Sequence, residues 1–145
     1  MRLSERLRKL VERAFAAWVR RIGDEWLDRV IGSPPVMRFM FAEMARRFEP
    51  DKGEGFAGDI VYELRRTDGR VVAWTVTVAG ARATARPGRA AEPQLRVLLG
   101  VADFARLAAQ QLEPGAALLA GRLDVHGDFA QAARLGAMFG QPGPF

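Results

Sequence analysis

Three ionisable residues at alternating positions, Asp124, His126 and Asp128, form the most suggestive chemical cluster in the sequence. Two-residue spacing in a strand places their side chains on one face, where a metal site or an acid–base pair could form. The chain has no second His and no Cys, and no neighbouring carboxylate completes a ligand set. We therefore favour a structural interpretation, with Asp124 and His126 on the solvent side of an outer strand and Asp128 as a helix N-cap.

A glycine pattern at Gly53, Gly55 and Gly58 satisfies G-x-G-x-x-G. A dinucleotide site needs a strand before this pattern and a helix after it. Here a helical segment precedes the glycines and a strand follows them, so we interpret the pattern as a loop. Nucleophiles are also scarce, because Cys is absent and the only serines are Ser4 and Ser33. We expect no enzyme, no catalytic residues, no metal and no cofactor.

The positive charge of the chain is concentrated near its N-terminus. Residues 1–47 carry 11 basic side chains against 6 acidic ones, whereas residues 48–145 carry 11 of each sign. This division predicts a basic, helical segment over 1–47, a balanced domain over 48–140 and a loose tail over 141–145. No stretch comes near the length of about 18 apolar residues that a membrane-spanning helix needs. Charged residues interrupt the N-terminal segment, so it lacks the continuous apolar region of a secretory signal. We expect a cytoplasmic protein that can bind a membrane peripherally.

Residues 3–22 have the pattern of an amphipathic helix, with the apolar side chains within an arc of about 140°. Two interpretations stay open for it. In the first, the helix lies on an anionic membrane. In the second, its apolar face packs on its own domain or on a second copy of the chain, which gives a homo-oligomer. The residues expected at the membrane or partner contact are Arg6, Lys9, Arg13, Trp18 and Arg20.

Nucleic-acid binding is not expected of this basic helix, because no exposed aromatic residues are interleaved with its basic side chains. Two further helices follow it, over 24–31 and 36–48, and the breaker at 32–35 separates them. The second of these helices is unusually rich in Met and Phe.

Beyond residue 55 the pattern changes to that of strands. Strands are predicted over 59–65, 71–78, 82–86, 94–99 and 122–126, and helices over 103–112, 115–120 and 128–139. The order predicts an α+β fold. We expect a five-stranded, mostly antiparallel sheet that is covered on one face by helices and carries an N-terminal helical extension.

The segment from Phe48 to Phe139 resembles the sterol carrier protein type 2 family. The similarity begins at Val61–Leu64 (VYEL) and continues through the strand-to-helix segment Leu95–Leu107. It is strongest over residues 113–139, where GRLDVHGD is similar to the family's G-K-L-x-V-x-G-D. Asp124 stands where the family commonly has Lys. The resemblance implies a hydrophobic tunnel between sheet and helices that holds a sterol, a fatty acyl chain, an isoprenoid or a similar lipid.

The resemblance also indicates which side chains line this tunnel. They are Trp74, Val76, Phe104, Leu107, Leu118, Leu119, Phe129, Leu135, Met138 and Phe139, with Phe39, Met40 and Met44 closing one end. The function implied is non-enzymatic lipid binding and transfer. The alternative is an accessory or scaffold protein that presents an isoprenoid quinone or its precursor to biosynthetic enzymes and docks through the N-terminal helices.

Overall fold

The structure is a computed structural model that describes residues 2–140, with side chains from residue 4 onward. The chain begins with four helices: α1 (Arg2–Arg21), α2 (Asp24–Ile31), α3 (Pro34–Arg46) and the short α4 (Pro50–Gly53). Two prolines occupy the first turn of α3, where a helix needs no backbone N–H donor. The first three helices confirm the segments expected from the sequence, whereas α4 was not predicted.

Five strands form one sheet. They are β1 (Gly58–Arg65), β2 (Val71–Ala79), β3 (Arg82–Pro87), β4 (Leu95–Gly100) and β5 (Leu123–Gly127), in the order β3-β2-β1-β4-β5. The β1–β4 pair is parallel and the other three pairs are antiparallel. The predicted five-stranded, mostly antiparallel sheet is confirmed.

The remaining helices are α5 (Val101–Ala108), α6 (Pro114–Leu119), α7 (Phe129–Ala132) and α8 (Leu135–Met138). The single helix predicted over 128–139 is wrong, because the chain turns between α7 and α8. At the end of α8, Met138 and Phe139 are both buried in the core. The Met138 carbonyl accepts a hydrogen bond from the Glu49 amide, at 2.7 Å.

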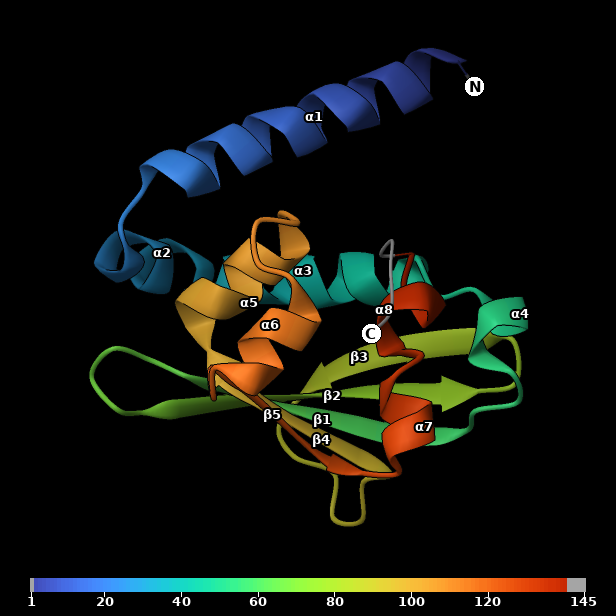
Figure 1. The fold of residues 1–145 in the computed structure, drawn as a ribbon. Helices are drawn as coiled ribbons and strands as arrows, with labels where there is room; N and C mark the ends of the chain where they lie inside the picture. Colours follow the sequence, from blue (N-terminus) through green and yellow to red (C-terminus); the bar gives the residue numbers. More distant parts are fainter. Residues whose placement is uncertain (1, 141–145) are drawn as a thin grey trace.

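The helices lie over one face of the sheet, and α1 crosses outermost, beyond the helices that cover the sheet (Figure 1). Ile60, Tyr62 and Leu64 alternate along β1 and are buried on the helix side, as the two-residue period predicts. Phe41 and Leu27, from α3 and α2, are fully buried in the same core. The second and third helices therefore build the core together with the sheet.

A side-chain network joins α2 to the turn between β1 and β2. The carboxylate of Asp28 is buried and accepts hydrogen bonds from the Thr67 amide at 3.0 Å and from Arg66 Nε at 3.4 Å. Arg66 also donates to the carbonyl oxygens of Asp28 and Gly32. This network pairs the buried charge of Asp28, which would be costly without a partner. It thereby joins α2 to one end of the sheet.

The opposite face of the sheet is covered in part by the loop between β3 and β4. Thr75 is fully buried there, and its hydroxyl donates to the Gly88 carbonyl at 2.8 Å and accepts from the Ala90 amide at 3.0 Å. In Figure 1 this loop hangs on the side of the sheet away from the helices. The main apolar core lies on the helical side of the sheet.

Candidate functional site

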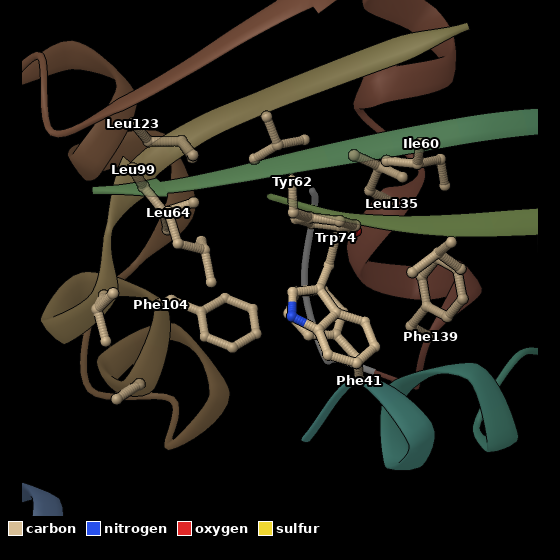
Figure 2. Close-up of a cluster of buried hydrophobic side chains, with 14 of the residues drawn as sticks. Phe41, Ile60, Tyr62, Leu64, Trp74, Leu99, Phe104, Leu123, Leu135 and Phe139 are labelled. Carbon is tan, nitrogen blue, oxygen red and sulfur yellow. The ribbon is translucent and has the colours of Figure 1, made fainter. Parts of the chain in front are cut away.

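Four aromatic side chains meet between the sheet and the helices. They are Phe41 of α3, Tyr62 of β1, Trp74 of β2 and Phe104 of α5, and all four are buried. The Phe41 ring lies parallel to Trp74, with ring centroids 5.0 Å apart, and nearly parallel to Phe104 at 5.1 Å. Figure 2 shows Phe41 reaching from α3 towards the Trp74 ring. We call these four residues the aromatic cluster.

Aliphatic and aromatic side chains surround this cluster on both sides. In Figure 2, Leu64, Leu99 and Leu123 lie beside Phe104, whereas Ile60, Leu135 and Phe139 lie on the other side of Trp74. Side chains thus occupy the region where the tunnel was expected, and six of its expected lining residues are buried in this core. Burial in this region raises the pKa of the Tyr62 hydroxyl far above its ordinary value, so Tyr62 stays neutral.

The expected lining residues fall into three groups by exposure. Those buried in the core are Trp74, Val76, Phe104, Leu135, Met138 and Phe139. Those partly buried are Met40, Met44, Leu107 and Leu118. Phe39, Leu119 and Phe129 are exposed, at 65%, 92% and 74%. The structure brings the first group together around the aromatic cluster and leaves the third group on the surface.

Sequence reasoning missed Phe41, which has more aromatic contacts than any other residue of the aromatic cluster. The sequence does contain a pattern that indicates burial of Phe41. Met37, Phe41 and Met44 recur at the i, i+4, i+7 spacing of a single helix face. On the same spacing Phe39 lies on the opposite face of α3, and it is exposed. The helical periodicity of the Met- and Phe-rich segment therefore distinguishes the buried Phe41 from the exposed Phe39.

An open groove lies beside the aromatic cluster, between α3 and the edge strand β3. Its volume is about 480 Å³, and its lining includes Trp74, which also belongs to the cluster. The other lining residues are Arg38, Ala42, Ala45, Arg46, Ala83, Thr84, Ala85 and Pro87. This groove therefore connects the surface with the edge of the core.

The second half of α1 packs against the core. Val19 is buried, and Trp18 is partly buried against the core. Trp18 lies on the predicted apolar stripe, and towards the N-terminus the same stripe carries Leu7, Leu10 and Val11, which are exposed at 55%, 60% and 64%. Arg6, Lys9, Arg13 and Arg20 are exposed as well.

Two polar contacts also hold α1 in place. Arg47 Nη2 lies 3.0 Å from Glu12 Oε1, and the Gln111 side chain donates to the Ala16 carbonyl. Among the helices within residues 2–140, none has the length and apolar character needed to cross a membrane.

Local structure accounts for Asp128 and for the glycine pattern, while Asp124 and His126 lie at the surface. His126 Nε2 lies 3.1 Å from Asp124 Oδ2, and both side chains are more than half exposed on β5. Asp128 accepts a hydrogen bond from the Gln131 amide at 3.0 Å and caps α7, as expected. In the glycine pattern, Gly58 has a φ of 133°, and a Cβ there would lie 2.3 Å from the Gln94 side chain. A positive φ and a close neighbour explain this glycine without a nucleotide.

Solved structures share this fold. An inverting sec-alkylsulfatase from a Pseudomonas species is 17% identical with a TM-score of 0.58, over 77% of this chain but only 17% of its own. Sterol carrier protein 2 from Yarrowia lipolytica is 15% identical with a TM-score of 0.55, over 68% of this chain and 90% of its own. Palmitated sterol carrier protein 2 like 2 from Aedes aegypti is 22% identical with a TM-score of 0.51, over 67% of this chain and 91% of its own.

At these identities the likeness shows a common fold. No match was found among curated protein sequences. The model of the SCP-2 sterol transfer family matches residues 42–140, which is more than half of the chain and includes the whole sheet. The chain belongs to the SCP-2 sterol transfer family.

Proposed function

We propose that this protein binds one lipid molecule between the sheet and the helices and transfers it between membranes without catalysing a reaction. The observation that carries the proposal is the aromatic cluster, where α3 and α5 meet the sheet through stacked rings. A lipid can replace such contacts without breaking hydrogen bonds, because they are apolar. Membership of a sterol transfer family supports the same function.

The energy for binding comes from the lipid's own apolar surface. Burial contributes about 0.8 kcal/mol per methylene, so a 16-carbon chain gains on the order of 10 kcal/mol before ordering costs. Part of this gain offsets the separation of Phe41 from Trp74 and Phe104, which are in contact in this structure. We propose that entry of a lipid moves α3 outward from the sheet.

A vesicle assay tests the transfer function. Donor vesicles carry a fluorescent fatty acid or a fluorescent sterol, and acceptor vesicles carry a quencher. The proposal predicts a transfer rate that rises in proportion to protein concentration for at least one of the two lipids. A rate equal to that of spontaneous transfer for both lipids contradicts it.

We further propose that the first half of α1 binds an anionic membrane during loading. The apolar residues Leu7, Leu10 and Val11 are exposed there and lie beside basic residues. An amphipathic helix of this kind inserts its apolar side below the headgroups while its arginines and lysines pair with the lipid phosphates. Trp18 is not included in this contact, because it packs against the core.

Two triple variants test this membrane contact. In the serine variant, Leu7, Leu10 and Val11 are each changed to Ser, and in the control variant exposed Arg29, Arg65 and Arg70 are each changed to Gln. The serine variant is expected to lose binding to phosphatidylserine vesicles, and the control to keep most of it. Binding of the unmodified protein should weaken with added salt.

The outcome that contradicts the membrane contact is equal binding by the serine variant and the unmodified protein. Light scattering during size exclusion provides a second readout. If the unmodified protein is a dimer and the serine variant a monomer, the stripe holds a second copy of the chain, as in the homo-oligomer alternative.

A further inference from the structure

The outer side of α1 carries a row of residues with the spacing of a helix-pairing surface. Four exposed apolar residues follow one another at alternating intervals of three and four positions, which is the a and d spacing of a two-helix coiled coil. They are Leu7, Leu10, Ala14 and Ala17, which we call the α1 seam. This spacing is typical of a helix that lies against another helix along its length.

The α1 seam faces away from the rest of the molecule. On its inner side α1 buries Val19, and Glu12 pairs with Arg47 at 3.0 Å. At about 100° per residue, Leu10 lies about 180° from Val19 around the helix axis, and Ala17 lies about 160° from it. In Figure 1, α1 is the outermost element. The seam is therefore left uncovered by the part of the chain that the structure describes.

A row of three arginines runs along one side of the α1 seam. Arg6, Arg13 and Arg20 are seven residues apart, so successive side chains are about 10.5 Å apart along the axis and on nearly the same side of the helix. All three are exposed, and none forms an ion pair with another residue of the described chain. The row occupies one flanking position of the heptad, where charged side chains determine which partner is accepted.

The neighbouring sequence supplies no acidic partner to this row. Neither Arg6 nor Arg13 has an Asp or a Glu three or four residues away, which is the spacing at which helical side chains pair. Asp24 follows Arg20 by four residues, but its carboxylate pairs with Arg106. The row is therefore complementary to acidic groups that another molecule supplies.

The charges disfavour a second copy of the chain as the partner. In an antiparallel pair of α1 helices, this row would face the same row of the second copy, and like charges repel. In a parallel pair it would face the heptad positions of Val11 and Trp18, which carry no opposite charge. An acidic helix of another protein can pair with all three arginines.

We propose that the α1 seam is a docking surface for an amphipathic helix of a partner protein, whose Glu or Asp side chains pair with Arg6, Arg13 and Arg20. The alanines of the seam allow the two helices to approach closely, and the leucines are buried against the apolar side of the partner. The inference rests in part on the membrane contact proposed above, because Leu7 and Leu10 belong to both surfaces. A docked helix therefore keeps α1 off the membrane, and its release permits loading.

Two designed peptides, each labelled for fluorescence anisotropy, test the docking surface on the full chain. Both carry Leu at the a and d positions of three heptads, and the acidic probe has Glu at e and g where the lysine probe has Lys. We expect the acidic probe to bind at least tenfold more tightly than the lysine probe, and added salt to weaken its binding. Equal binding of the two probes, or no binding of the acidic probe up to about 1 mM, overturns the proposal.

A triple variant tests the arginine row. Changing Arg6, Arg13 and Arg20 to Gln should weaken binding of the acidic probe at least tenfold, because it removes the opposite charges. The arginine-to-glutamine control variant of the membrane test has the same net charge, leaves α1 unchanged and should bind the probe as the unmodified protein does. An equal loss in both variants shows that only net charge matters and overturns the role of the row.

A double variant separates helix docking from membrane binding. In Ala14→Gln/Ala17→Gln, longer side chains hold a second helix away from the α1 seam, whereas the three residues assigned to the membrane contact are unchanged. The variant should bind the acidic probe at least tenfold more weakly and bind phosphatidylserine vesicles as the unmodified protein does. Unchanged affinity for the probe overturns the placement of the partner helix on the seam.

Competition between the acidic probe and phosphatidylserine vesicles tests the effect on membrane contact. A saturating amount of the probe should release most of the protein from sedimented vesicles. If the probe binds and vesicle binding is unaffected, the competition is overturned. If the protein binds the probe but never the vesicles, the membrane contact fails while helix docking is supported. If light scattering shows a dimer that Ala14→Gln/Ala17→Gln converts to a monomer, a second copy occupies the seam and the partner-protein proposal is overturned.

Discussion

Phe39 and Phe41 show how strongly the face of a helix decides the role of a residue. They lie two positions apart on α3, yet Phe41 is fully buried among Tyr62, Trp74 and Phe104, whereas Phe39 is 65% exposed. The sequence-based expectation placed Phe39 at the end of the tunnel and omitted Phe41. Composition indicated a Met- and Phe-rich helix, and only its periodicity distinguishes the buried residue.

This difference leads to a matched prediction. Phe41→Ala should lower the free energy of unfolding by about 3–5 kcal/mol, because it removes a large buried ring and leaves a cavity. Phe39→Ala should change it by less than about 0.5 kcal/mol, since an exposed ring loses little packing. Urea denaturation of both variants measures the two values. Similar losses of unfolding free energy for both variants would contradict this prediction. They would mean that α3 is rotated about its own axis relative to this structure.

Glu63 predicts a pH dependence on the face of the sheet away from the helices. Its side chain is 11% exposed and pairs with Arg89 at 2.9 Å and with Arg96 at 3.0 Å. Burial acts to raise its pKa, but the hydrogen bonds from the two arginines outweigh burial and hold the pKa below the ordinary value. A lowered pKa in the folded state stabilises the protein above the unfolded pKa, and this stabilisation is lost as pH falls through the folded value.

The variant Glu63→Gln should therefore lose less stability than the unmodified protein between about pH 5 and pH 3. Unfolding midpoints in urea, taken at several pH values across this window, give the comparison. The variant Glu92→Gln, in the exposed loop before β4, serves as the control and should follow the unmodified protein. Parallel curves for Glu63→Gln and the unmodified protein would contradict the stabilising role of this carboxylate.

At the scale of elements, α1 combines two environments along one apolar stripe. Trp18 is partly buried against the core, whereas Leu7, Leu10 and Val11 are more than half exposed. The sequence predicted the stripe, because the spacing of apolar residues is regular from end to end. Which part of the stripe is buried depends on how far the rest of the molecule extends beneath the helix, and periodicity carries no information about that.

The serine variant of α1 should consequently keep the stability of the unmodified protein to within about 0.5 kcal/mol, since exposed side chains lose little on substitution. Val19→Ser should lower the free energy of unfolding by about 1–3 kcal/mol, because it places a hydroxyl in an apolar contact. Thermal or urea unfolding distinguishes the two. A large loss in the serine variant would show that the first half of α1 is packed in solution.

In the other elements, the sequence predicts local structure better than it predicts contacts between distant segments. The alternation of Ile60, Tyr62 and Leu64 identified the buried face of β1, since a strand has a period of two. The parallel pairing of β1 with β4 depends on the path of the chain between them. Arg134, in the turn between α7 and α8, pairs with Glu54 at 2.6 Å, and the local sequence pattern over 128–139 gives no sign of that distant contact.

At the scale of the whole molecule, the boundary expected at residue 47 concerns charge and not packing. The net charge of the first 47 residues lies mostly on exposed side chains, while Leu27, Ile31, Met37 and Phe41 of the same segment are fully buried. Deleting the first 32 residues would therefore remove part of the core along with α1. Substitutions on the surface of α1 test its role without this loss.

The sequence predicted many of the residues of the candidate site, but it did not predict how they are arranged. Trp74, Phe104 and Phe139 were expected beside the lipid, and the structure places them in one core. The alanine-lined groove was not expected, because small residues on β3 give no hydrophobic signal in the sequence. Its shape arises only when Ala83 and Ala85 are placed beneath α3.

The central claim is that one lipid molecule is accommodated between the sheet and the helices. Native mass spectrometry tests it most directly: the protein is freed of lipid by denaturation and refolding, and is then incubated with palmitate and with cholesterol. The account predicts a complex with one bound lipid in at least one incubation. It also predicts that the protection of the Phe41 and Phe104 amides from hydrogen exchange changes when the lipid binds. Absence of a bound lipid in both incubations, for protein that has regained its original unfolding midpoint, would contradict it.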